Sequence, residues 1–108
     1  MIDSDLPPLR GFQRKFLRGL AHALTPIVHV GKEGISDAVV AAVEHALLDH
    51  ELIKVRLHRP DDKKAMAAAL ATRSAAHLCG LVGHVAILYR EHPEAPQIAV
   101  PRSPGRIA

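Results

Sequence analysis

The stretch IVHVGKEGIS, residues 27–36, contains a predicted strand, a loop with two glycines and the start of a predicted helix. The run IVHV is short and rich in β-branched residues, which is typical of a strand. Ser36 is a favourable N-cap and Asp37 follows it in the first helical turn. The predicted helix then runs to about His50 and has an apolar face. The residues of that face are Val39, Val40, Val43, Leu47 and Leu48.

The loop between these two elements, GKEG at residues 31–34, has two interpretations. Glycines are common in tight turns, so the loop could serve only to reverse the chain. Backbone amides at a strand-to-helix junction can also point at a phosphate, with Lys32 adding a mobile positive charge. The loop is not a P-loop, because Ile35 follows the second glycine, and it is not a KH loop, which joins two helices. The pattern alone leaves the turn and the phosphate site both open.

Upstream of the loop, residues 9–24 fit an amphipathic helix that ends at Thr25-Pro26. We expect one face to be apolar and buried and the opposite face to be basic and exposed. The predicted apolar face consists of Phe12, Phe16, Leu17, Leu20 and Leu24, and the predicted basic face of Arg10, Arg14, Lys15, Arg18 and His22.

Downstream, LIKVRLHR at residues 52–59 alternates strictly between apolar and cationic side chains, which predicts a strand with one buried face. Pro60-Asp61-Asp62 then begins an alanine-rich helix that runs to about Ser74. Two further strands follow, joined by a two-residue turn at Gly83-His84. The predicted order is α-β-α-β-α-β-β. It indicates an α/β chain of the α+β two-layer type, with a four-stranded mixed sheet packed with helices.

The chain of 108 residues is long enough for one core, and its 48% apolar composition is typical of a globular domain. We expect a single domain over residues 9–92, between a short acidic leader at 1–8 and a proline-rich arm at 93–108. No apolar run approaches the roughly 20 residues that a membrane span needs. A single cysteine and the absence of an apolar leader sequence favour a cytoplasmic location.

The charge and the aromatic content restrict the possible partners. The net charge is +3, and the cations are concentrated between Arg10 and Lys32, where no acidic residue interrupts them. Such clustering is typical of a surface that binds nucleic acid. Only three aromatic residues are present, Phe12, Phe16 and Tyr89, so extensive base stacking is not expected.

Three other residue types are further functional candidates. The eight histidines form no HExxH motif and no Cys-x-x-Cys accompanies them, so we predict no metal site. His29 and His84 could face RNA but are more often structural. Cys79 lies in an apolar strand without a visible base, which favours a core residue over a nucleophile. Tyr89 could stack on a base, although core packing is the commoner role.

Several stretches together resemble one known family. They are LRGLAHALTPIVHVGKEGIS, HELIKVRL, GLVGHVAILYR and the tail IAVPR. In this order they are similar to the YhbY family of stand-alone CRM domains, the chloroplast RNA splicing and ribosome maturation module, over about residues 9–102. The resemblance implies a fold similar to the C-terminal domain of translation initiation factor three. It also implies RNA binding and, in bacteria, an association with precursors of the large ribosomal subunit.

The resemblance assigns RNA-binding residues to the glycine loop, the first helix and two strands. These residues are Gly31, Lys32, Glu33 and Gly34; Arg14, Lys15, Arg18 and His22; Lys54 and Arg56; and Arg90. The chain departs from the family at Ser74-Ala75-Ala76, where threonine-glycine-alanine is usual. The glycine that would end the helix in the left-handed conformation is therefore missing. Glu33 also adds a negative charge where a phosphate would approach.

We therefore expect a monomeric, non-enzymatic RNA-binding protein that contacts ribosomal RNA in precursors of the large subunit as an assembly factor. It should need no cofactor, metal, small-molecule substrate or membrane. The alternative is a protein-interaction module that docks a ribosomal or assembly protein through its sheet face or its proline-rich arm.

Overall fold

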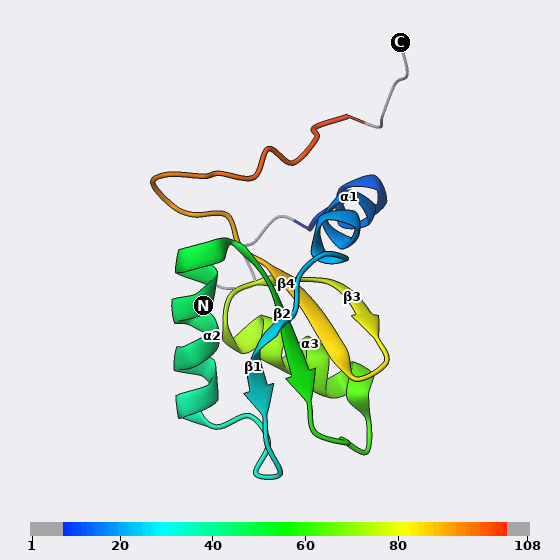
Figure 1. The fold of residues 1–108 in the computed structure, drawn as a ribbon, viewed down its shortest axis with the longest axis vertical. Helices are drawn as coiled ribbons and strands as arrows, with labels where there is room; N and C mark the ends of the chain where they lie inside the picture. The colour runs from blue at the N-terminus through cyan, green and yellow to red at the C-terminus, as the bar shows by residue number, and fades with distance from the viewer. Residues whose placement is uncertain (1–7, 104–108) are drawn as a thin grey trace.

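The computed structural model describes residues 8–103, and their helices and strands follow the predicted order (Figure 1). The elements are α1 (Gly11–Ala21), β1 (Pro26–Val30), α2 (Asp37–His50), β2 (Leu52–Leu57), α3 (Lys63–Arg73), β3 (His77–Val82) and β4 (Val85–Tyr89). The strands form one sheet in the order β1-β2-β4-β3. β1 is parallel to β2, whereas β4 is antiparallel to both of its neighbours. The predicted fold class is confirmed.

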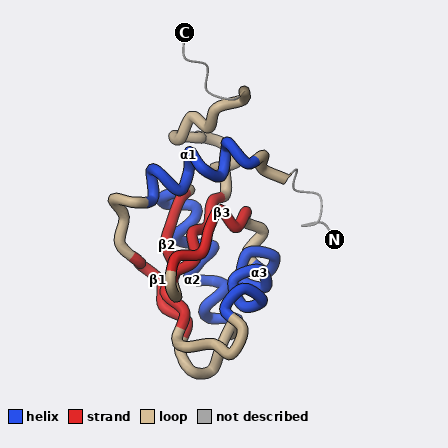
Figure 2. Tube along the Cα trace, turned by 90° about the vertical axis from the view of Figure 1, so that its right-hand side faces the viewer, coloured by secondary structure: helices blue, strands red, loops and turns tan. Residues whose placement is uncertain are grey.

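The main core lies between one face of this sheet and the helices α2 and α3, which lie together on that side (Figure 2). Strict alternation in β2 places Ile53, Val55 and Leu57 on this face, as predicted, and all three are buried. Leu47 of α2 and Leu70 of α3 pack in the same cluster. Within residues 8–103, no helix is long and apolar enough to cross a bilayer.

A second, smaller core lies on the opposite face of the sheet. Leu17 and Ala21 of α1 pack there with Leu52 of β2 and Ile87 of β4. The arm that follows β4 adds Ile98, with Leu9 and Val100 also packed against this cluster. Helix α1 and the arm therefore add a partial third layer to the two predicted layers. The glycine loop lies at the other end of the molecule (Figure 1).

The predicted apolar face of α1 is largely wrong. Leu17 is fully buried, but Phe16, Leu20 and Leu24 are 37%, 43% and 39% exposed. Arg14 and Arg18 turn towards the protein instead, because each guanidinium group finds a backbone carbonyl to which it can donate. Long arginine stems can pack on apolar surface while the charged head stays polar, so periodicity alone does not locate the buried side of such a helix.

The bounds of α1 and the apolar face of α2 also differ from prediction. α1 is shorter than the predicted 9–24, since it begins at Gly11 and ends at Ala21. Leu48 of α2, which was predicted to face the core, is 43% exposed, whereas Val43 and Leu47 are buried as predicted. The N-caps of α2 and α3 are confirmed: Ser36 accepts a hydrogen bond from the Val39 N–H, and Asp62 accepts one from Ala65.

The carboxylate of Glu51 fastens the arm to the domain. Glu51 is the C-cap of α2 and has a positive φ of 65°. Its two carboxylate oxygens accept hydrogen bonds from the N–H groups of His92 at 2.7 Å, Gln97 at 2.9 Å and Ile98 at 2.9 Å. Burial opposes ionisation of Glu51, but these three donors outweigh it, so the pKa of the carboxyl is lowered. Gln13 of α1 holds the arm further along, through a 3.0 Å bond to the Pro101 carbonyl.

The arm is therefore attached to the domain at Gln97, Ile98, Val100 and Pro101, while most of its other residues up to 103 are exposed. Residues 1–7 of the predicted leader and residues 104–108 of the predicted arm lie outside the described residues.

The end of α3 uses an alanine where glycine is favoured. Ala75 has a φ of 54°, in the left-handed region. The Ala76 N–H donates to the Ala71 carbonyl at 2.8 Å, and the Ala75 N–H donates to Thr72 at 3.2 Å. These two bonds form a Schellman motif with Ala75 at the C′ position. The helix thus ends where the family pattern places its glycine, and the Cβ of Ala75 is strained.

We predict that Ala75→Gly stabilises the protein by about 0.5–1 kcal/mol, because glycine adopts a positive φ without the clash that a Cβ causes. Urea unfolding measures the difference. Ala69→Gly, at an exposed position inside the same helix, is the matched control and should instead destabilise the protein by about 1 kcal/mol. A loss of stability at residue 75 similar to that at residue 69 would contradict the assigned C-cap.

We predict that Glu51→Gln destabilises the protein by about 1–3 kcal/mol at pH 7, because an amide nitrogen cannot accept the bonds that the carboxylate accepts. Since the pKa of Glu51 is lowered in the folded state, the charge contributes stability above the ordinary value of 4.5 and loses it as the pH falls below. Wild type and variant should therefore converge in acid. The exposed neighbour Glu91→Gln is the control, and equal stability of the Glu51 and Glu91 variants at pH 7 would contradict the role of Glu51.

Candidate functional site

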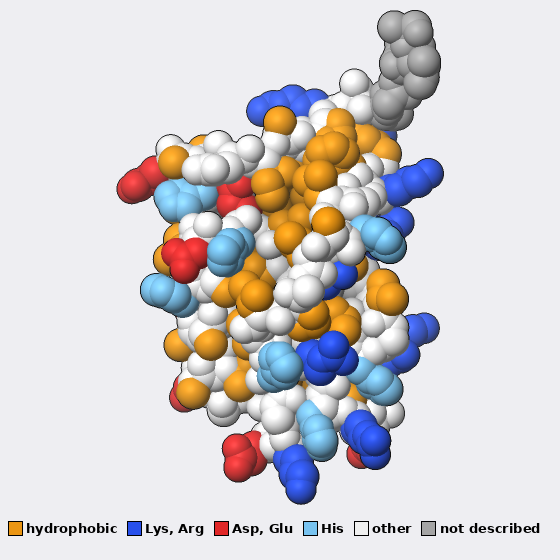
Figure 3. Space-filling view, in the orientation of Figure 1, with side chains coloured by type: hydrophobic (Ala, Val, Ile, Leu, Met, Phe, Trp, Pro, Cys, Tyr) orange, Lys and Arg blue, Asp and Glu red, His pale blue; other side chains and the backbone are white. Residues whose placement is uncertain are grey.

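Helix α1 covers only part of its face of the sheet, and the remainder is open. Alternation in β1 and β2 turns Ile27, His29, Lys54 and Arg56 towards this open part. Val82 of β3 borders it and is 65% exposed. In the view of Figure 3, Lys, Arg and His side chains gather over the lower part of the molecule, where the ends of β1 and β2 lie. The open part of the sheet is therefore a cationic surface with apolar patches.

A groove of about 420 Å³ lies where α1 meets this open surface. We call it the groove. Its cationic wall, formed by Arg18, His22, Lys54 and Arg56, and its apolar floor, formed by Val82, Val85 and Ile87, come from different elements. It is lined by Arg18 and His22 of α1 and its C-cap, by Pro26, Lys54 and Arg56 of β1 and β2, and by Val82, Val85 and Ile87 of the hairpin. This combination can hold an anionic chain along the wall while apolar groups of the same ligand contact the floor.

Arg18 is held in place by β3. Its Nη1 donates to the Cys79 carbonyl at 2.9 Å, beside an irregularity in the β3–β4 pairing between Leu78 and Gly80. The absence of a side chain at Gly80 makes this position possible, since a Cβ there would stand 2.6 Å from Cδ of Arg18. The remaining guanidinium donors of Arg18 stay available at the groove.

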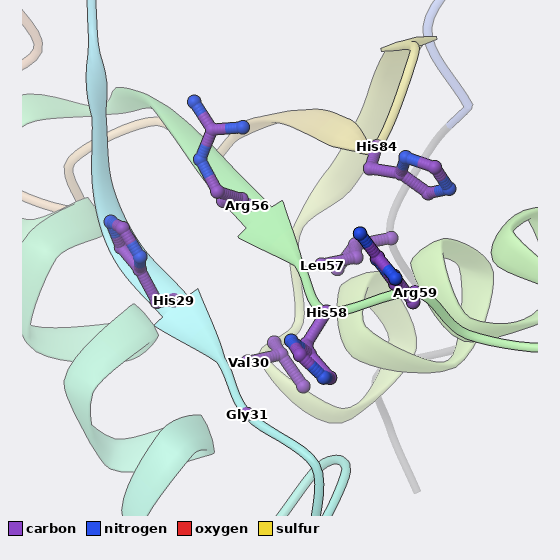
Figure 4. A pocket seen from close by; sticks show the side chains of 8 residues that line it. All are labelled: His29, Val30, Gly31, Arg56, Leu57, His58, Arg59 and His84. Atoms are coloured by element: carbon purple, nitrogen blue, oxygen red, sulfur yellow. The ribbon is translucent and has the colours of Figure 1, made fainter.

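Lys54 and Arg56 come from the same face of β2. The Lys54 Nζ donates to the Leu24 carbonyl at 3.0 Å, so the lysine also fixes the segment between α1 and β1. Arg56 lines the groove and also a second cavity of about 410 Å³ beyond it. We call this second cavity the basin. It is lined by His29, Val30, Gly31, Arg56, Leu57, His58, Arg59 and His84 (Figure 4). The groove and the basin therefore adjoin at Arg56.

The glycine loop borders the basin at Gly31. The Gly34 N–H donates to the Gly31 carbonyl at 3.0 Å, which closes a turn. Gly34 has a φ of 79°, so the turn itself requires a glycine there. Gly31 has no such requirement, and a Cβ at Gly31 would have no atom within 4 Å. The turn therefore explains only the second glycine, and the first leaves open space at the edge of the basin.

An ion pair secures the chain between this loop and α2. Arg73 at the end of α3 donates to the Ile35 carbonyl at 2.7 Å and to the Asp37 carboxylate at 2.9 Å. The segment that connects the loop to α2 is therefore bonded to the end of α3.

The structure brings most of the predicted site residues together. Arg18, His22, Lys54 and Arg56 line the groove, and Gly31 lines the basin. Three further predicted residues, Lys32, Glu33 and Gly34, form the turn that follows Gly31.

Three predicted site residues lie elsewhere. Arg14 is half-buried and donates to the Leu9 carbonyl, and Lys15 lines neither cavity. Arg90 follows β4 at the opposite end of the sheet, where it donates to the Ser74 carbonyl at 2.8 Å and so supports the end of α3. The family resemblance assigned Arg90 to RNA binding and did not reveal that this arginine has a structural partner.

Four cationic or protonatable residues of the basin were not among the predicted site residues: His29, His58, Arg59 and His84. The sequence had raised His29 and His84 as residues that could face RNA but favoured a structural role for both, and in the sheet His29 pairs with Arg56. His58 and Arg59 lie in a loop whose approach to β1 depends on the tertiary fold.

Cys79 and Tyr89 belong to the core. Both are buried in the cluster beneath α1. Burial raises the pKa of the Cys79 thiol to about 11, despite the opposing effect of Arg18 and Arg14. Burial likewise raises the pKa of Tyr89 to about 12, and its ring stacks on His77 with the centroids 6.2 Å apart. Neither side chain lines the groove, so neither can contact a ligand there. Among residues 8–103, no three His, Cys, Asp or Glu side chains group as metal ligands would.

Comparison with known proteins gives consistent matches across α1 to β4. The model of the CRS1 / YhbY (CRM) domain matches residues 9–90. "Probable RNA-binding protein YqeI" of Bacillus subtilis is 41% identical over 95 residues, covering 86% of this chain and 99% of that protein. An "RNA-binding protein" of Haemophilus influenzae is 40% identical over 92 residues, covering 83% and 92%. The solution structure of the hypothetical protein SAV1595 from Staphylococcus aureus matches with a TM-score of 0.76 at 36% identity, covering 86% and 99%.

We predict that Gly80→Ala costs about 1 kcal/mol in wild type, because the new Cβ displaces Arg18 and breaks its bond to Cys79. In an Arg18→Ala background the same change should cost almost nothing. Urea unfolding of the four proteins in this double-mutant cycle should give a coupling of about 0.5–1 kcal/mol. Gly31→Ala, where a Cβ meets nothing, is the control and should be additive with Arg18→Ala. Additive effects at Gly80 would refute the assigned position of Arg18.

Proposed function

This chain belongs to the CRS1 / YhbY (CRM) domain family, and on that premise we propose that it binds RNA at the groove and the basin. One observation carries the proposal. The two cavities adjoin at Arg56, and among residues 8–103 no acidic side chain lines either of them. The names of the relatives from Bacillus subtilis and Haemophilus influenzae describe RNA-binding proteins.

The residues of the groove suit a phosphate backbone. Arginine donates several hydrogen bonds in a fixed planar arrangement, which matches phosphate oxygens, and lysine supplies a point charge. Arg18 and Lys54 are already held by the carbonyls of Cys79 and Leu24, so less side-chain freedom is lost when a ligand binds. The groove should therefore bind RNA with little rearrangement.

Sequence preference should be modest. The floor of the groove offers Val82 and Val85, which can contact a ribose or a base edge without specific hydrogen bonds. Among residues 8–103, no Phe, Tyr or Trp lines the groove or the basin, so base stacking there would be limited to histidine and arginine side chains. Contacts to phosphates position RNA but do not distinguish bases. The shape of the RNA and the placement of its phosphates should decide binding.

We further propose that the RNA is ribosomal RNA in precursors of the large subunit and that the protein acts there as a monomeric assembly factor. This step rests on the resemblance to the YhbY family. The protein would act by holding RNA in a particular shape and would make or break no bond. Crosslinking in cells, followed by sequencing of the attached RNA, tests this assignment. Recovery of large-subunit precursor RNA would support it, and recovery of unrelated RNAs alone would overturn it.

A protein-interaction module is the second candidate. Phe16, Leu20, Leu24 and Ile27 are exposed apolar residues on α1, the segment after it and β1, and such residues favour protein contacts. A salt titration of binding separates the two candidates. Each phosphate that the protein neutralises steepens the fall of log affinity with log salt by about 0.7 on single strands and about 0.9 on duplex. A steep slope supports RNA binding, whereas an apolar protein interface gives little dependence.

We predict that Lys32→Gln weakens RNA binding and that Glu33→Gln strengthens it, each by up to about 1 kcal/mol at low salt. The reason is that both side chains are exposed in the turn beside Gly31, where one attracts and the other repels a phosphate. Fluorescence anisotropy with a labelled RNA hairpin measures both changes, which should shrink together at high salt.

Two control variants make the same charge changes outside both cavities. Lys15→Gln lies on α1 and Asp49→Asn on α2, and neither residue lines the groove or the basin. Each should change the affinity less than its partner in the loop. If the loop variants move the affinity no more than these controls, the loop acts only as a turn.

A further inference from the structure

We propose that the basin is a phosphate-binding site in which protonation of His29, His58 and His84 strengthens the binding of RNA. This inference rests on the proposed RNA-binding function and adds to it a titratable site for one phosphate of the backbone. It predicts that the affinity for RNA rises as the pH falls.

The three imidazoles come from three separate segments that meet around one cavity. His29 lies on β1, His58 follows β2, and His84 lies in the turn between β3 and β4 (Figure 4). Arg56 and Arg59 complete the cationic lining of this space of about 410 Å³. Five cationic or protonatable side chains thus surround a single opening.

Backbone hydrogen bonds fix these segments relative to one another. The His58 N–H donates to the Val30 carbonyl at 3.0 Å, next to His29. The Leu57 N–H donates to the His84 carbonyl at 2.7 Å. His29 also pairs in register with Arg56. Main-chain hydrogen bonds therefore hold the segments that carry the three histidines in fixed positions around the basin.

The charges around the basin leave its cations without an acidic partner. None of the residues that line it is acidic. Lys32, Glu33, Asp61 and Asp62 lie on the adjoining loops but do not line it, and the Asp62 carboxylate accepts the bond that caps α3. Within residues 8–103, the ion pairs join other residues, Arg73 with Asp37 and His45 with Asp49. A proton gained by a basin histidine would therefore add net positive charge that an anion can neutralise.

The chemistry favours a phosphate over a metal ion. Two arginines beside the three histidines would repel a divalent cation, whereas they donate hydrogen bonds to phosphate oxygens. The backbone gives a second indication. Arg59 has a φ of 32°, which a residue with a Cβ rarely adopts, and its side chain lines the basin. Strained residues of this kind tend to cluster at binding sites.

Protonation and binding must strengthen each other. Imidazole is the side chain that ordinarily gains charge between pH 8 and pH 5. If RNA binds the protonated basin more tightly, it must also favour protonation there by the same factor. Because the basin and the groove adjoin at Arg56, one RNA strand that passes Arg56 can reach both cavities.

The test compares the affinity for a fluorescently labelled RNA hairpin at pH 6 and at pH 8 and constant ionic strength. Wild type should bind about tenfold more tightly at pH 6, the change that corresponds to a shift of one pKa unit on binding. A triple variant, His29→Gln with His58→Gln and His84→Gln, should lose most of this change yet still bind at pH 8. The control variant, His45→Gln with His50→Gln on α2, should keep it. Equal pH dependence in wild type and the triple variant would overturn the proposal.

Arg59→Asn provides a variant that should fold, since asparagine tolerates a positive φ. It should weaken RNA binding at both pH values without lowering the melting temperature. Unchanged affinity would argue against the basin as a phosphate site.

Proton NMR of the histidine side chains separates the failure of this inference from the failure of the proposed function. The probes are the RNA hairpin and inorganic tripolyphosphate. At pH 6, RNA should shift the imidazole resonances of His29, His58 and His84 and leave those of His45 unchanged. If RNA binds but no basin histidine responds, the inference is wrong and the proposed function stands. If tripolyphosphate shifts these resonances but RNA does not bind, the anion site stands and the RNA-binding function is wrong.

Discussion

Gly80 leaves room for the Arg18 side chain on the sheet, and this contact ties α1 to β3 beside its buried residues Leu17 and Ala21. With Arg18 lying along β3 and bonded to the Cys79 carbonyl, the helix turns Leu17 and Ala21 to the sheet. The helix then covers only part of that face. The uncovered part carries Lys54 and Arg56, and the groove forms along the boundary between helix and strand.

The two faces of the sheet have different roles. The face covered by α2 and α3 provides most of the buried apolar surface, and its residues alternate regularly along β2. The other face has a smaller core that α1 shares with the arm, and Glu51 holds the arm there by three backbone hydrogen bonds. Stability thus comes chiefly from one face, and this leaves the open half of the other free to present cations.

Local sequence patterns predicted the elements whose surroundings are regular. The alternation of LIKVRL, the caps Ser36 and Asp62 and the turn at Gly83-His84 depend on residues close in sequence, and the structure bears them out. The face of α1 could not be predicted in the same way. Arg18 stays exposed but lies along β3, because a carbonyl on that distant strand accepts its hydrogen bond and a distant glycine makes space for it.

The candidate site could likewise be predicted only in part, because some of its residues come together through contacts between segments that are distant in the sequence. Arg56 and Lys54 follow from alternation within one strand, and Gly31 from the loop. The position of Arg90 depends on Ser74, and the histidines of the basin meet only when β1, β2 and the β3–β4 turn are assembled. At Ala75 the sequence lacks the glycine that usually ends this helix, yet the residue still adopts the left-handed conformation.

The central claim is that RNA occupies the open half of the sheet face beside α1. Mapping of backbone amide chemical shifts by NMR, with and without an RNA hairpin, tests it most directly. The largest changes should fall on Gly31, Arg56, Val82 and His84, while His45 and Asp49 on α2 should change little. Changes concentrated on α2, α3 or the arm, with the groove and the basin unaffected, would contradict the claim.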